Sequence, residues 1–519
     1  MNVHEKDSFV IGIDCGTESV RAGVFNMSGR PLAYGVKEYP LTLPRPGWAE
    51  QNPNDWWHAI TLAVREAVQK AGVKPERIRG ISADATSCTV VVMDKSGNHM
   101  RNAIIWMDVR AADQSKRIAA SGDPALKYNG WGSVSPEWMP CKALWLKENE
   151  PEVYHNAYRV MEFTDWIMYK LTGEYVASIN TATARWYYDR PSGGWPLSFY
   201  EKIGLEDLID KFPQRVLNLG EVVGPLAPQA AKALGLPAGI PISQGGADAF
   251  VAMIGLNVVR PGRLAFITGS SHLHLGLSEK EFHAPGIFGG FPDAVIPGLS
   301  MVEGGQVSTG SVLKWLRDHF CHGIREEANA LGLDVYALLD KKAQALPPGS
   351  QGLIVLEYWQ GNRTPWVDPD ARGTVWGLSL AHRPEHVFRA IMEGIAYGTE
   401  LIFQNFARHG FAFDEIVACG GPVKSELWMQ IHADVSGRPI LFTEVAQAPA
   451  LGSAVLAAVG AGLYSDIAEA SDHMVHFKSR LEPDFSRHEE YKFFFDKYVR
   501  TYEQLKGLMH EMGDKVRMG

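Results

Sequence analysis

Cysteine is scarce in this 519-residue chain, and its spacing excludes two kinds of small structural site. The five cysteines are Cys15, Cys88, Cys141, Cys321 and Cys419. Their number is odd, they are widely scattered, and no Cys-x-x-Cys pair occurs. This pattern supports neither a zinc site nor a disulfide framework. We therefore expect buried, reduced cysteines in a reducing compartment, which indicates a cytoplasmic protein.

Long apolar runs and an excess of positive charge are also missing. No run of about 18 apolar residues exists, so we expect no membrane-spanning helix. The first residues, MNVHEKDSFVIGIDCG, lack the basic flank and apolar stretch of a signal peptide. The formal net charge is −9, so no basic stripe is available to bind a nucleic acid. A nucleotide remains a candidate ligand, because local donors and a metal ion would hold it rather than net charge.

The length of the chain predicts two domains, because single hydrophobic cores stop growing at roughly 250–300 residues. Two segments, 9–33 and 263–279, share the plan of an apolar run, a Gly-containing turn and a second apolar run. This plan is typical of a β-hairpin, and each hairpin would open a domain. The boundary is expected within 255–266. We predict an N-terminal domain over 1–258 and a C-terminal domain over 259–519.

Strand-like and helix-like segments alternate within each half, which favours α/β domains with mixed sheets. Residues 52–72 have apolar side chains at helical spacing after an Asn/Asp start, so they are predicted to form a helix. Residues 383–410 form a second predicted helix, entered by a proline near its first turn. The tail after about Phe477 is charged and helical in pattern.

The turn DCGTESVR, from Asp14 to Arg21, lies between two predicted strands and could bind phosphate. Gly16 lets backbone amides approach an anion, and Thr17 adds a hydroxyl donor. Asp14, at the strand end, is placed to hold Mg²⁺ directly or through water. The alternative is an ordinary hairpin turn, and the turn TGSS at 268–271 has the same ambiguity. Two such turns opening two lobes together indicate a pair of phosphate-binding turns.

Two further glycine pairs each precede a predicted helix. In GGADAF, Asp248 stands at the start of its helix. Its carboxylate either stabilises the helix dipole or takes a proton from a hydroxyl that attacks a phosphoryl group. In ACGGPVKS, Gly420 and Gly421 would let a flat ligand such as adenine lie on the backbone, although such a pair is often only a tight turn.

Taken in order, these segments resemble the FGGY carbohydrate kinases over nearly the whole chain. The landmarks are DCGTESVR, DATSCT, WMDVR, GGADAF, TGSS, EGGQ, GTVWGL and GGPVKS. The most specific is GTVWGL (373–378) followed by HVFRAIME (386–393), which fits the C-terminal signature of the family. Residues 142–149 resemble the N-terminal signature more weakly. The chain is identified as a member of this family.

The resemblance implies two ribonuclease-H-like domains of the actin/hexokinase type around a deep cleft, and a kinase that uses Mg·ATP. By the same resemblance Asp248 is the catalytic base and Asp14 lies at the Mg²⁺ site. The residues that fall on nucleotide- or phosphate-binding positions are Gly16, Thr17, Arg21, Gly269, Ser270, Gly310, Lys314, Gly421 and Ser425. Ser270 replaces a usual threonine and keeps the hydroxyl, whereas lysine is unusual at position 314.

The sugar site is expected in the N-terminal lobe, where polar residues follow two predicted strands. Asp84 lies in DATSCT, and Trp106, Asp108 and Arg110 lie in WMDVR. Carboxylates and a guanidinium can each pair with two neighbouring hydroxyls of a sugar. The alternative is a structural salt bridge between Asp108 and Arg110 or Arg21.

DATSCT, WMDVR and EGGQ, the last containing Glu303, look more like the ribulokinase branch than like xylulokinases or glycerol kinases. Arg185, before a tryptophan, departs from the lysine usual in ribulokinases, and the two side chains are not interchangeable. The resemblance to the ribulokinase branch makes a pentulose, ribulose ahead of xylulose, the first choice of substrate, and Arg185 is the departure that keeps other sugars open. A pentitol or tetritol such as ribitol or erythritol comes next.

Other classes of protein share this fold, including regulators that bind a sugar without turnover. The retained Asp248, Asp14 and both turns argue against an inactive relative. A homodimer would fit the family, but the sequence identifies no interface.

Overall fold

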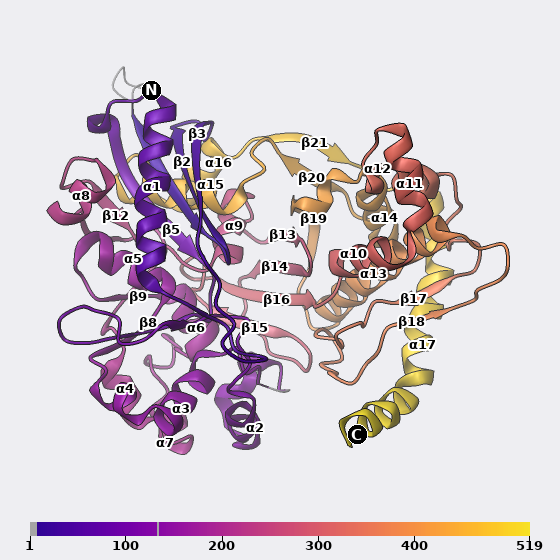
Figure 1. Cartoon of the computed structure of the whole chain (residues 1–519), viewed down its shortest axis with the longest axis horizontal. Coiled ribbons are helices and arrows are strands. Elements are labelled where there is room, and N and C mark those ends of the chain that lie inside the picture. The colour runs from indigo at the N-terminus through magenta and orange to yellow at the C-terminus, as the bar shows by residue number, and fades with distance from the viewer. Residues whose placement is uncertain (1–7, 132–133, 519) are drawn as a thin grey trace.

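The computed structural model describes residues 8–131 and 134–518, and it has two lobes, each built on a mixed β-sheet (Figure 1). In spatial order, the described strands of the N-terminal sheet are β11 (Val222–Pro225), β12 (Pro241–Ser243), β5 (Ile78–Ala85), β1 (Phe9–Cys15), β2 (Ser19–Asn26) and β3 (Pro31–Glu38). Those of the C-terminal sheet are β15 (Phe288–Pro292), β16 (Ser300–Gln306), β14 (His272–Ser278), β13 (Gly262–Thr268), β19 (Phe413–Gly420), β20 (Ile440–Thr443) and β21 (Phe477–Leu481).

Smaller sheets and many helices complete the two lobes. The small sheets contain β4 (Glu50–Gln51), β7 (Ala103–Ile104), β6 (Val90–Met93) and β8 (Arg159–Glu162); β10 (Arg215–Leu217) and β9 (Val176–Ser178); and β17 (Ile354–Leu356) and β18 (Thr374–Trp376). The helices before β13 are α1 (Pro53–Ala71), α2 (Ala112–Ala120), α3 (Met139–Asn149), α4 (Pro151–Asn156), α5 (Phe163–Thr172), α6 (Ile179–Trp186), α7 (Leu197–Lys202), α8 (Pro228–Leu234) and α9 (Asp248–Gly255). Those after it are α10 (Gly310–Phe320), α11 (His322–Leu331), α12 (Val335–Gln344), α13 (Pro384–Arg408), α14 (Glu426–Ser436), α15 (Ala448–Gly460), α16 (Ile467–Met474) and α17 (Phe485–Met518).

Both predicted hairpins are present, and each has the same place in its lobe. β1 pairs antiparallel with β2 and parallel with β5, and β13 pairs antiparallel with β14 and parallel with β19. The carboxyl end of each first strand therefore meets the carboxyl end of a parallel neighbour. This arrangement brings predicted site residues together at the carboxyl ends of the strands in each sheet.

The two predicted helices are confirmed, and local signals explain their ends. α1 begins after Asn52, whose side-chain oxygen accepts a hydrogen bond from the Asn54 backbone N–H at 3.0 Å. It ends at Gly72, which has a left-handed φ of 65° that glycine adopts without strain. α13 begins at Pro384, a residue preorganised for the first helical position.

The tail departs from the predicted all-helical pattern. Phe477–Leu481 forms β21, which pairs antiparallel with β20 at the edge of the C-terminal sheet, and the long helix α17 begins only at Phe485. The charged, alternating sequence FKSRL satisfies an exposed edge strand as well as a helix face, so its sequence alone did not separate the two.

Helix α15 lies late in the sequence but packs on the N-terminal sheet and on α9 (Figure 1). The contact is very close, because a Cβ atom on Gly12 would lie 2.0 Å from the Ala450 carbonyl oxygen. One on Gly80 would lie 2.4 Å from that of Ala457. Small residues on both sides thus bring helix and sheet backbones together. The first lobe in space therefore includes a helix from the second half of the chain.

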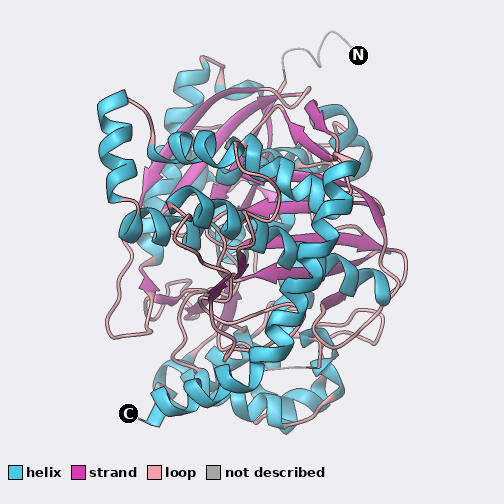
Figure 2. Cartoon of the chain, turned by 90° about the vertical axis from the view of Figure 1, so that its right-hand side faces the viewer, coloured by secondary structure: helices cyan, strands magenta, loops and turns pink. Residues whose placement is uncertain are grey.

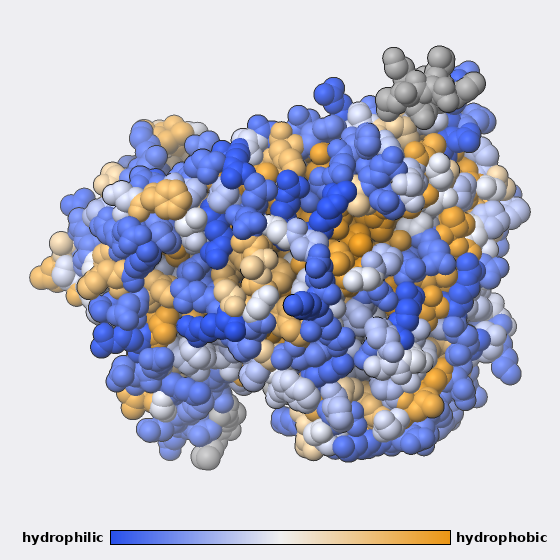
Figure 3. Space-filling view, turned by 180° about the vertical axis from the view of Figure 1, so that it is seen from behind, coloured by the Kyte–Doolittle hydropathy of each residue, from blue (hydrophilic) through white to orange (hydrophobic). Residues whose placement is uncertain are grey.

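Helices cover the sheets of both lobes (Figure 2), and the rear face is mostly hydrophilic and indented at its lower edge between the lobes (Figure 3). All five cysteines are buried and free, as predicted. Within the described part of the chain, no helix is both long enough and apolar enough to cross a membrane.

Candidate functional site

The first turn, residues 14–21, connects β1 to β2 at the end of these strands in the N-terminal sheet. Its backbone is closed by the Gly16 N–H, which donates to the Ser19 carbonyl oxygen at 3.0 Å. Arg21, on β2, lies opposite Asp14, and their side chains are 3.6 Å apart. A carboxylate and a guanidinium therefore flank the turn, side by side.

Residues from outside the turn hold it in place. The Gln51 side chain donates to the Thr17 carbonyl oxygen at 2.6 Å, and the Tyr39 hydroxyl donates to that of Gly16. The indole N–H of Trp106 donates to the Thr17 hydroxyl oxygen at 3.0 Å. The Thr17 proton thus remains available for a further acceptor. Trp106, predicted for the sugar site, is 36% exposed and links that region to the first turn.

Three carboxyl groups converge beside this turn: Asp14, Asp84 and Asp248. Asp84 is the register partner of Asp14 on β5, is fully buried, and accepts a hydrogen bond from the Ser453 hydroxyl of α15 at 2.7 Å. Burial raises the pKa of Asp84 well above its ordinary value, and the neighbouring Asp14 carboxyl raises it further. The Asp84 carboxyl is therefore buried on the inner side of the site, and its hydrogen-bond partner is a residue of the protein.

Asp248 is the first residue of α9, and its carboxylate accepts a hydrogen bond from the Ala249 N–H at 2.7 Å. Burial raises the pKa of Asp248 to about 7, and the Asp14 carboxyl contributes in the same direction. The Arg185 guanidinium opposes this shift. A carboxyl group with this pKa can take up and release a proton near neutral pH.

The glycine pair before Asp248 is required by packing. A Cβ atom on Gly245 would lie 1.8 Å from the Ala83 carbonyl oxygen, and one on Gly246 would lie 2.7 Å from the Asn180 side-chain oxygen. Asn180 accepts from the Ala247 N–H at 2.9 Å and donates to the Ala294 carbonyl oxygen of the other lobe at 2.6 Å. No local sequence pattern indicates this role for Asn180, because its partners lie 67 and 114 positions away in the chain.

Arg185 and Glu303, both predicted for the sugar site, meet across the two lobes. Arg185, on α6, places two guanidinium nitrogens 3.2 and 3.3 Å from Oε2 of Glu303, on β16. The guanidinium also lies over the Phe250 ring at 5.1 Å, close to Asp248. The structure thus brings together Arg185, Asp248 and Glu303.

Asp108 and Arg110 form a fully buried ion pair, which is the structural alternative considered for them. Arg110 Nη2 is 2.7 Å from Asp108 Oδ2, which also accepts from the Ala49 N–H at 2.5 Å. The Arg110 guanidinium lies over the Trp48 ring at 3.8 Å. Both side chains therefore hold the segments around Ala49 and Trp106 together, and their predicted contact with a sugar stays a prediction.

A buried lysine and a buried glutamate, neither of them predicted, brace the loop after β5. The Lys142 ammonium donates to the Cys88 and Ile105 carbonyl oxygens at 2.6 and 2.7 Å. Glu162 accepts from the N–H groups of Cys88 and Thr89 at 3.3 and 3.2 Å. Burial lowers the pKa of Lys142. Buried lysines are rare, so no sequence pattern predicts that this one lies inside.

The second turn, residues 268–271, is bonded to the start of α10. The Gly310 N–H and the Ser311 hydroxyl donate to the carbonyl oxygens of Gly269 and Ser270 at 3.2 and 3.0 Å. A Cβ atom on Gly310 would lie 2.4 Å from the Gly269 carbonyl oxygen, so glycine is required there. Lys314 lies exposed on the same helix, one turn further. The second turn and a helix N-terminus thus form one unit.

The Gly-Gly turn at 420–421 lies beside the second turn, because Gly420 is the register partner of Thr268. Gly420 has a φ of 107°, and a Cβ atom there would lie 1.9 Å from the Thr268 carbonyl oxygen. Gly421 differs, because a Cβ atom on it would meet nothing within 4 Å. Packing therefore requires the first glycine, while the second faces open space. Ser425 caps α14 by accepting from the Trp428 N–H at 3.1 Å.

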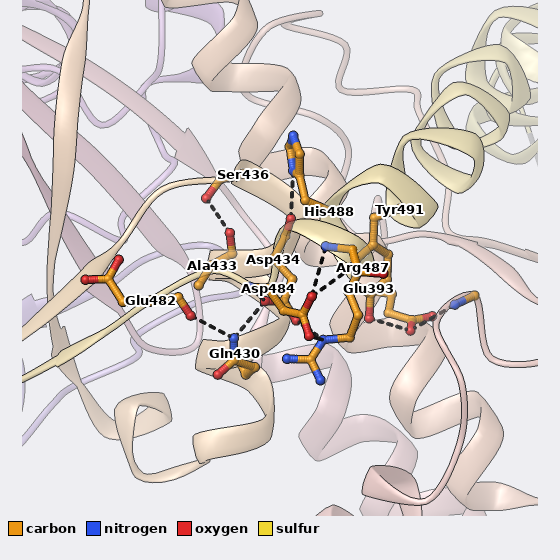
Figure 4. Close-up of polar contacts among 12 residues, drawn as sticks. Glu393, Gln430, Ala433, Asp434, Ser436, Glu482, Asp484, Arg487, His488 and Tyr491 are labelled. Atoms are coloured by element: carbon orange, nitrogen blue, oxygen red, sulfur yellow. Dashed lines mark hydrogen bonds and ion pairs between the residues drawn. The ribbon is translucent and has the colours of Figure 1, made fainter.

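The long C-terminal helix α17 anchors α14 through one buried carboxylate, Asp434 (Figure 4). Asp434 accepts from Arg487 Nε and from the Gln430 side chain, each at 2.7 Å, and from the Asp484 N–H at 2.8 Å. His488 is bonded to its carbonyl oxygen at 2.8 Å. Helix α14, which follows the Gly-Gly turn, is therefore held in position by its contacts with α17.

Among the described residues, no group of three or more His, Cys, Asp and Glu side chains is arranged to hold a metal ion. Mg²⁺ in phosphotransferases is usually bound by one or two carboxylates together with phosphate oxygens and water. Burial raises the pKa of Asp14 against the effect of Arg21, but the carboxyl remains partly exposed beside the turn. Asp14 therefore fits a metal that is held mainly by the nucleotide.

Comparison with known proteins places the whole chain in one family. Residues 9–255 match the N-terminal domain of the FGGY family of carbohydrate kinases, and residues 264–461 match the C-terminal domain of that family. A ribulokinase of Geobacillus thermodenitrificans is 34% identical over 500 residues, which cover 90% of this chain and 89% of the relative. A human FGGY carbohydrate kinase domain-containing protein is 31% identical, with 98% of each chain covered.

The solved structure of a xylulose kinase from Rhodospirillum rubrum superposes with a TM-score of 0.87 at 28% identity, covering 97% of this chain and all of that one. The predicted α/β fold of two actin/hexokinase-type domains is confirmed, as is the enzyme class, a phosphotransferase that acts on a sugar hydroxyl. The chain belongs to the FGGY family of carbohydrate kinases, and it resembles the ribulokinase branch.

Proposed function

We propose that this protein is a kinase that transfers the γ-phosphate of Mg·ATP to a hydroxyl of a pentulose, with ribulose as the first candidate. The observation that carries the proposal is the position of Asp248. Its carboxyl group lies beside Asp14 of the first turn and near Arg185, and its pKa of about 7 suits a general base. The Asp248 carboxyl thus lies between a turn suited to phosphate and side chains suited to a sugar.

In the proposed reaction, Asp248 accepts the proton of the sugar hydroxyl as its oxygen attacks the γ-phosphorus. The bond from that phosphorus to the β,γ-bridging oxygen breaks, and ADP leaves. The Thr17 and Ser270 hydroxyls and the backbone N–H groups of both turns would donate to the phosphate oxygens. Mg²⁺, held at Asp14, would neutralise charge on the phosphates when bound. Gly16, Arg21, Gly269, Gly310, Lys314, Gly421 and Ser425 complete the proposed nucleotide site.

The choice of a pentulose rests on the relatives named ribulokinase and on the Arg185–Glu303 pair. Xylulose, ribitol and erythritol remain alternatives, because an arginine fork presents donors differently from the lysine usual in that branch. Trp106 is proposed as a further sugar contact. Asp84, Asp108 and Arg110 are proposed to belong to the same sugar site, on its buried side. A cytoplasmic location and a homodimer complete the proposal.

A coupled assay of ADP release with a panel of pentuloses and pentitols tests the function. We expect ATP turnover that depends on a pentulose and on added Mg²⁺. The competing hypothesis, a regulator without catalysis, predicts sugar binding by calorimetry with no ADP release from any member of the panel. Faster turnover with a pentitol than with every pentulose would contradict the proposed substrate class but not the enzyme class.

A further inference from the structure

The Glu303 carboxylate is bound at both of its oxygens by guanidinium groups from opposite lobes. Oε2 faces Arg185 of the N-terminal lobe, at 3.2 Å from Nη2. Oε1 accepts a hydrogen bond from Arg363 Nη2 of the C-terminal lobe at 2.6 Å. Glu303 is only 1% exposed. Both oxygens of this buried carboxylate are therefore held in position by positively charged partners.

The two arginines differ in how they are themselves held. Arg185 is nearly buried, lies over the rings of Trp138 and Phe250, and also donates to the Ala184 carbonyl oxygen at 2.9 Å. Arg363 comes from the loop between β17 and β18 and lies over the Phe288 ring at 5.2 Å. Its side chain is 33% exposed. Arg185 belongs to the proposed sugar site, whereas Arg363 contacts that site through Glu303.

We propose that Arg363 is a specificity-determining residue that positions Glu303 for the sugar. The inference rests on the proposed function, because it assumes that Glu303 accepts hydrogen bonds from sugar hydroxyls. A carboxylate has about four acceptor sites, so the bonds to the two arginines leave room for a hydroxyl. The two bonds from Arg185 to Oε2 and the one from Arg363 to Oε1 leave one acceptor site, on Oε1, and with Arg363 in place it points in a fixed direction.

A fixed acceptor distinguishes two epimers better than a mobile one. Ribulose and xylulose differ only in the configuration of one hydroxyl, at C3. An acceptor at a fixed position can bond that hydroxyl in one configuration and is left unpaired in the other, which is how polar sites reject close analogues. Without Arg363, the Glu303 side chain could turn about its own bonds and follow either epimer. The loss of Arg363 should therefore reduce selectivity more than it reduces catalysis.

The test compares Arg363→Gln and Arg363→Lys with the wild type in steady-state kinetics on ribulose and xylulose. Arg263→Gln is the matched control, since Arg263 is in the same lobe, is also 33% exposed, and pairs with Glu415 at 3.1 Å. For Arg363→Gln we expect KM for the preferred epimer to rise about tenfold, the lower limit for a lost charge-assisted hydrogen bond. KM for ATP should stay the same, and the ratio of kcat/KM between the epimers should fall. Lysine should restore part of that ratio.

Unchanged sugar KM and unchanged selectivity in Arg363→Gln would overturn the inference. So would an equal loss on both epimers accompanied by a lower Tm, because that result indicates a purely structural role. A wild-type protein that phosphorylates neither pentulose overturns the proposed function instead. Arg363 is then judged by the ratio of the two sugar Kd values from calorimetry, and the absence of any sugar binding would overturn both proposals.

Discussion

Asp248 depends on its neighbours for its chemistry. An isolated aspartate titrates near 3.9 and would be a weak base for a sugar hydroxyl. Burial and the Asp14 carboxyl raise the pKa of Asp248 to about 7, so the same side chain becomes a base matched to neutral pH. The fold thus supplies the basicity, and the sequence supplies only the carboxyl group.

Asp248→Asn removes this basicity while keeping the shape and a hydrogen-bond acceptor. We expect turnover to fall by at least about 10²-fold, the lower limit for the loss of a general base. Sugar affinity should change little, as measured by calorimetry. The Tm at pH 8 should not fall, because a carboxyl whose pKa is raised in the folded state costs stability as pH rises from its ordinary pKa near 4 to about 7, and the full cost is present above that. Near wild-type turnover in this variant would remove Asp248 from the mechanism.

The pH dependence of kcat/KM tests the same group without mutating it. A base must be ionised, so activity should decline as pH falls below about 7, with an acid limb near the raised pKa of Asp248. Asp14→Asn removes one of the two causes of that rise and should shift the limb to lower pH, whatever it does to the rate. An acid limb near pH 4 in the wild type would show that Asp248 is not the titrating base.

Residues near one another in sequence could be predicted, and residues with distant partners could not. Asp14, Thr17 and Asp248 stand in short turns whose chemistry is local. Arg363 lies 60 positions from its partner Glu303, and Ser453 lies 369 positions from Asp84. No periodicity or turn pattern connects positions so far apart, so these contacts appear only in the folded chain.

At the scale of elements, the first and second turns occupy the same structural position in the two lobes. Each closes a hairpin at the strand ends of a mixed sheet and presents a glycine and a hydroxyl. We expect Thr17→Val and Ser270→Ala each to raise KM for ATP about tenfold, because each loses a hydrogen bond to a charged phosphate. Sugar binding without nucleotide should be unaffected. Thr61→Val, on α1, serves as the control, and a loss of sugar affinity in either turn variant would assign that turn to a different site.

Helix α15 offers a test of close packing. Gly452→Ala would place a Cβ atom 2.1 Å from the Val251 carbonyl oxygen, so helix and α9 must separate. We expect a loss of about 1–3 kcal/mol in the free energy of unfolding, typical of overpacking. Gly507→Ala in α17 meets nothing within 4 Å and should instead gain about 0.5–1 kcal/mol from helix propensity. Equal shifts in Tm for the two variants would contradict the packing argument.

The elements were easier to predict than their assembly. Hairpins and amphipathic helices follow from local patterns, and both hairpins and both long helices were found as expected. The sequence of α15 is apolar and rich in alanine, but no local pattern in it indicates which sheet the helix covers. Its attachment to the first lobe is a property of the complete chain, as is the pairing of β21 with β20.

At the scale of the molecule, the contacts between the lobes include a group near the proposed sugar site. Arg185 meets Glu303, Asn180 donates to the Ala294 carbonyl oxygen, and Lys127 lies 2.9 Å from Glu281. These contacts would act as a pivot if the nucleotide side of the lobes opened and closed. Closure would exclude water from the γ-phosphate and assemble the site.

We therefore expect the correct sugar to reduce the radius of gyration in solution scattering, whereas a non-substrate sugar should not. The same sugar should raise the ratio of sugar phosphorylation to idle ATP hydrolysis, because closure favours the sugar over water as acceptor. An unchanged shape together with equally fast hydrolysis in the absence of sugar would show that specificity does not come from closure.

The position of α15 also constrains how the protein can be made. During synthesis the strands β1 and β5 leave the ribosome early, but the helix that covers their Gly12 and Gly80 positions follows several hundred residues later. Until then an apolar face of the first sheet lies open to solvent, and exposed faces of this kind promote aggregation. The first lobe cannot complete its core as an independent unit, so nascent chains depend on reaching residue 460 intact. A kinase assembled in this way cannot complete its first lobe until α15 has been translated.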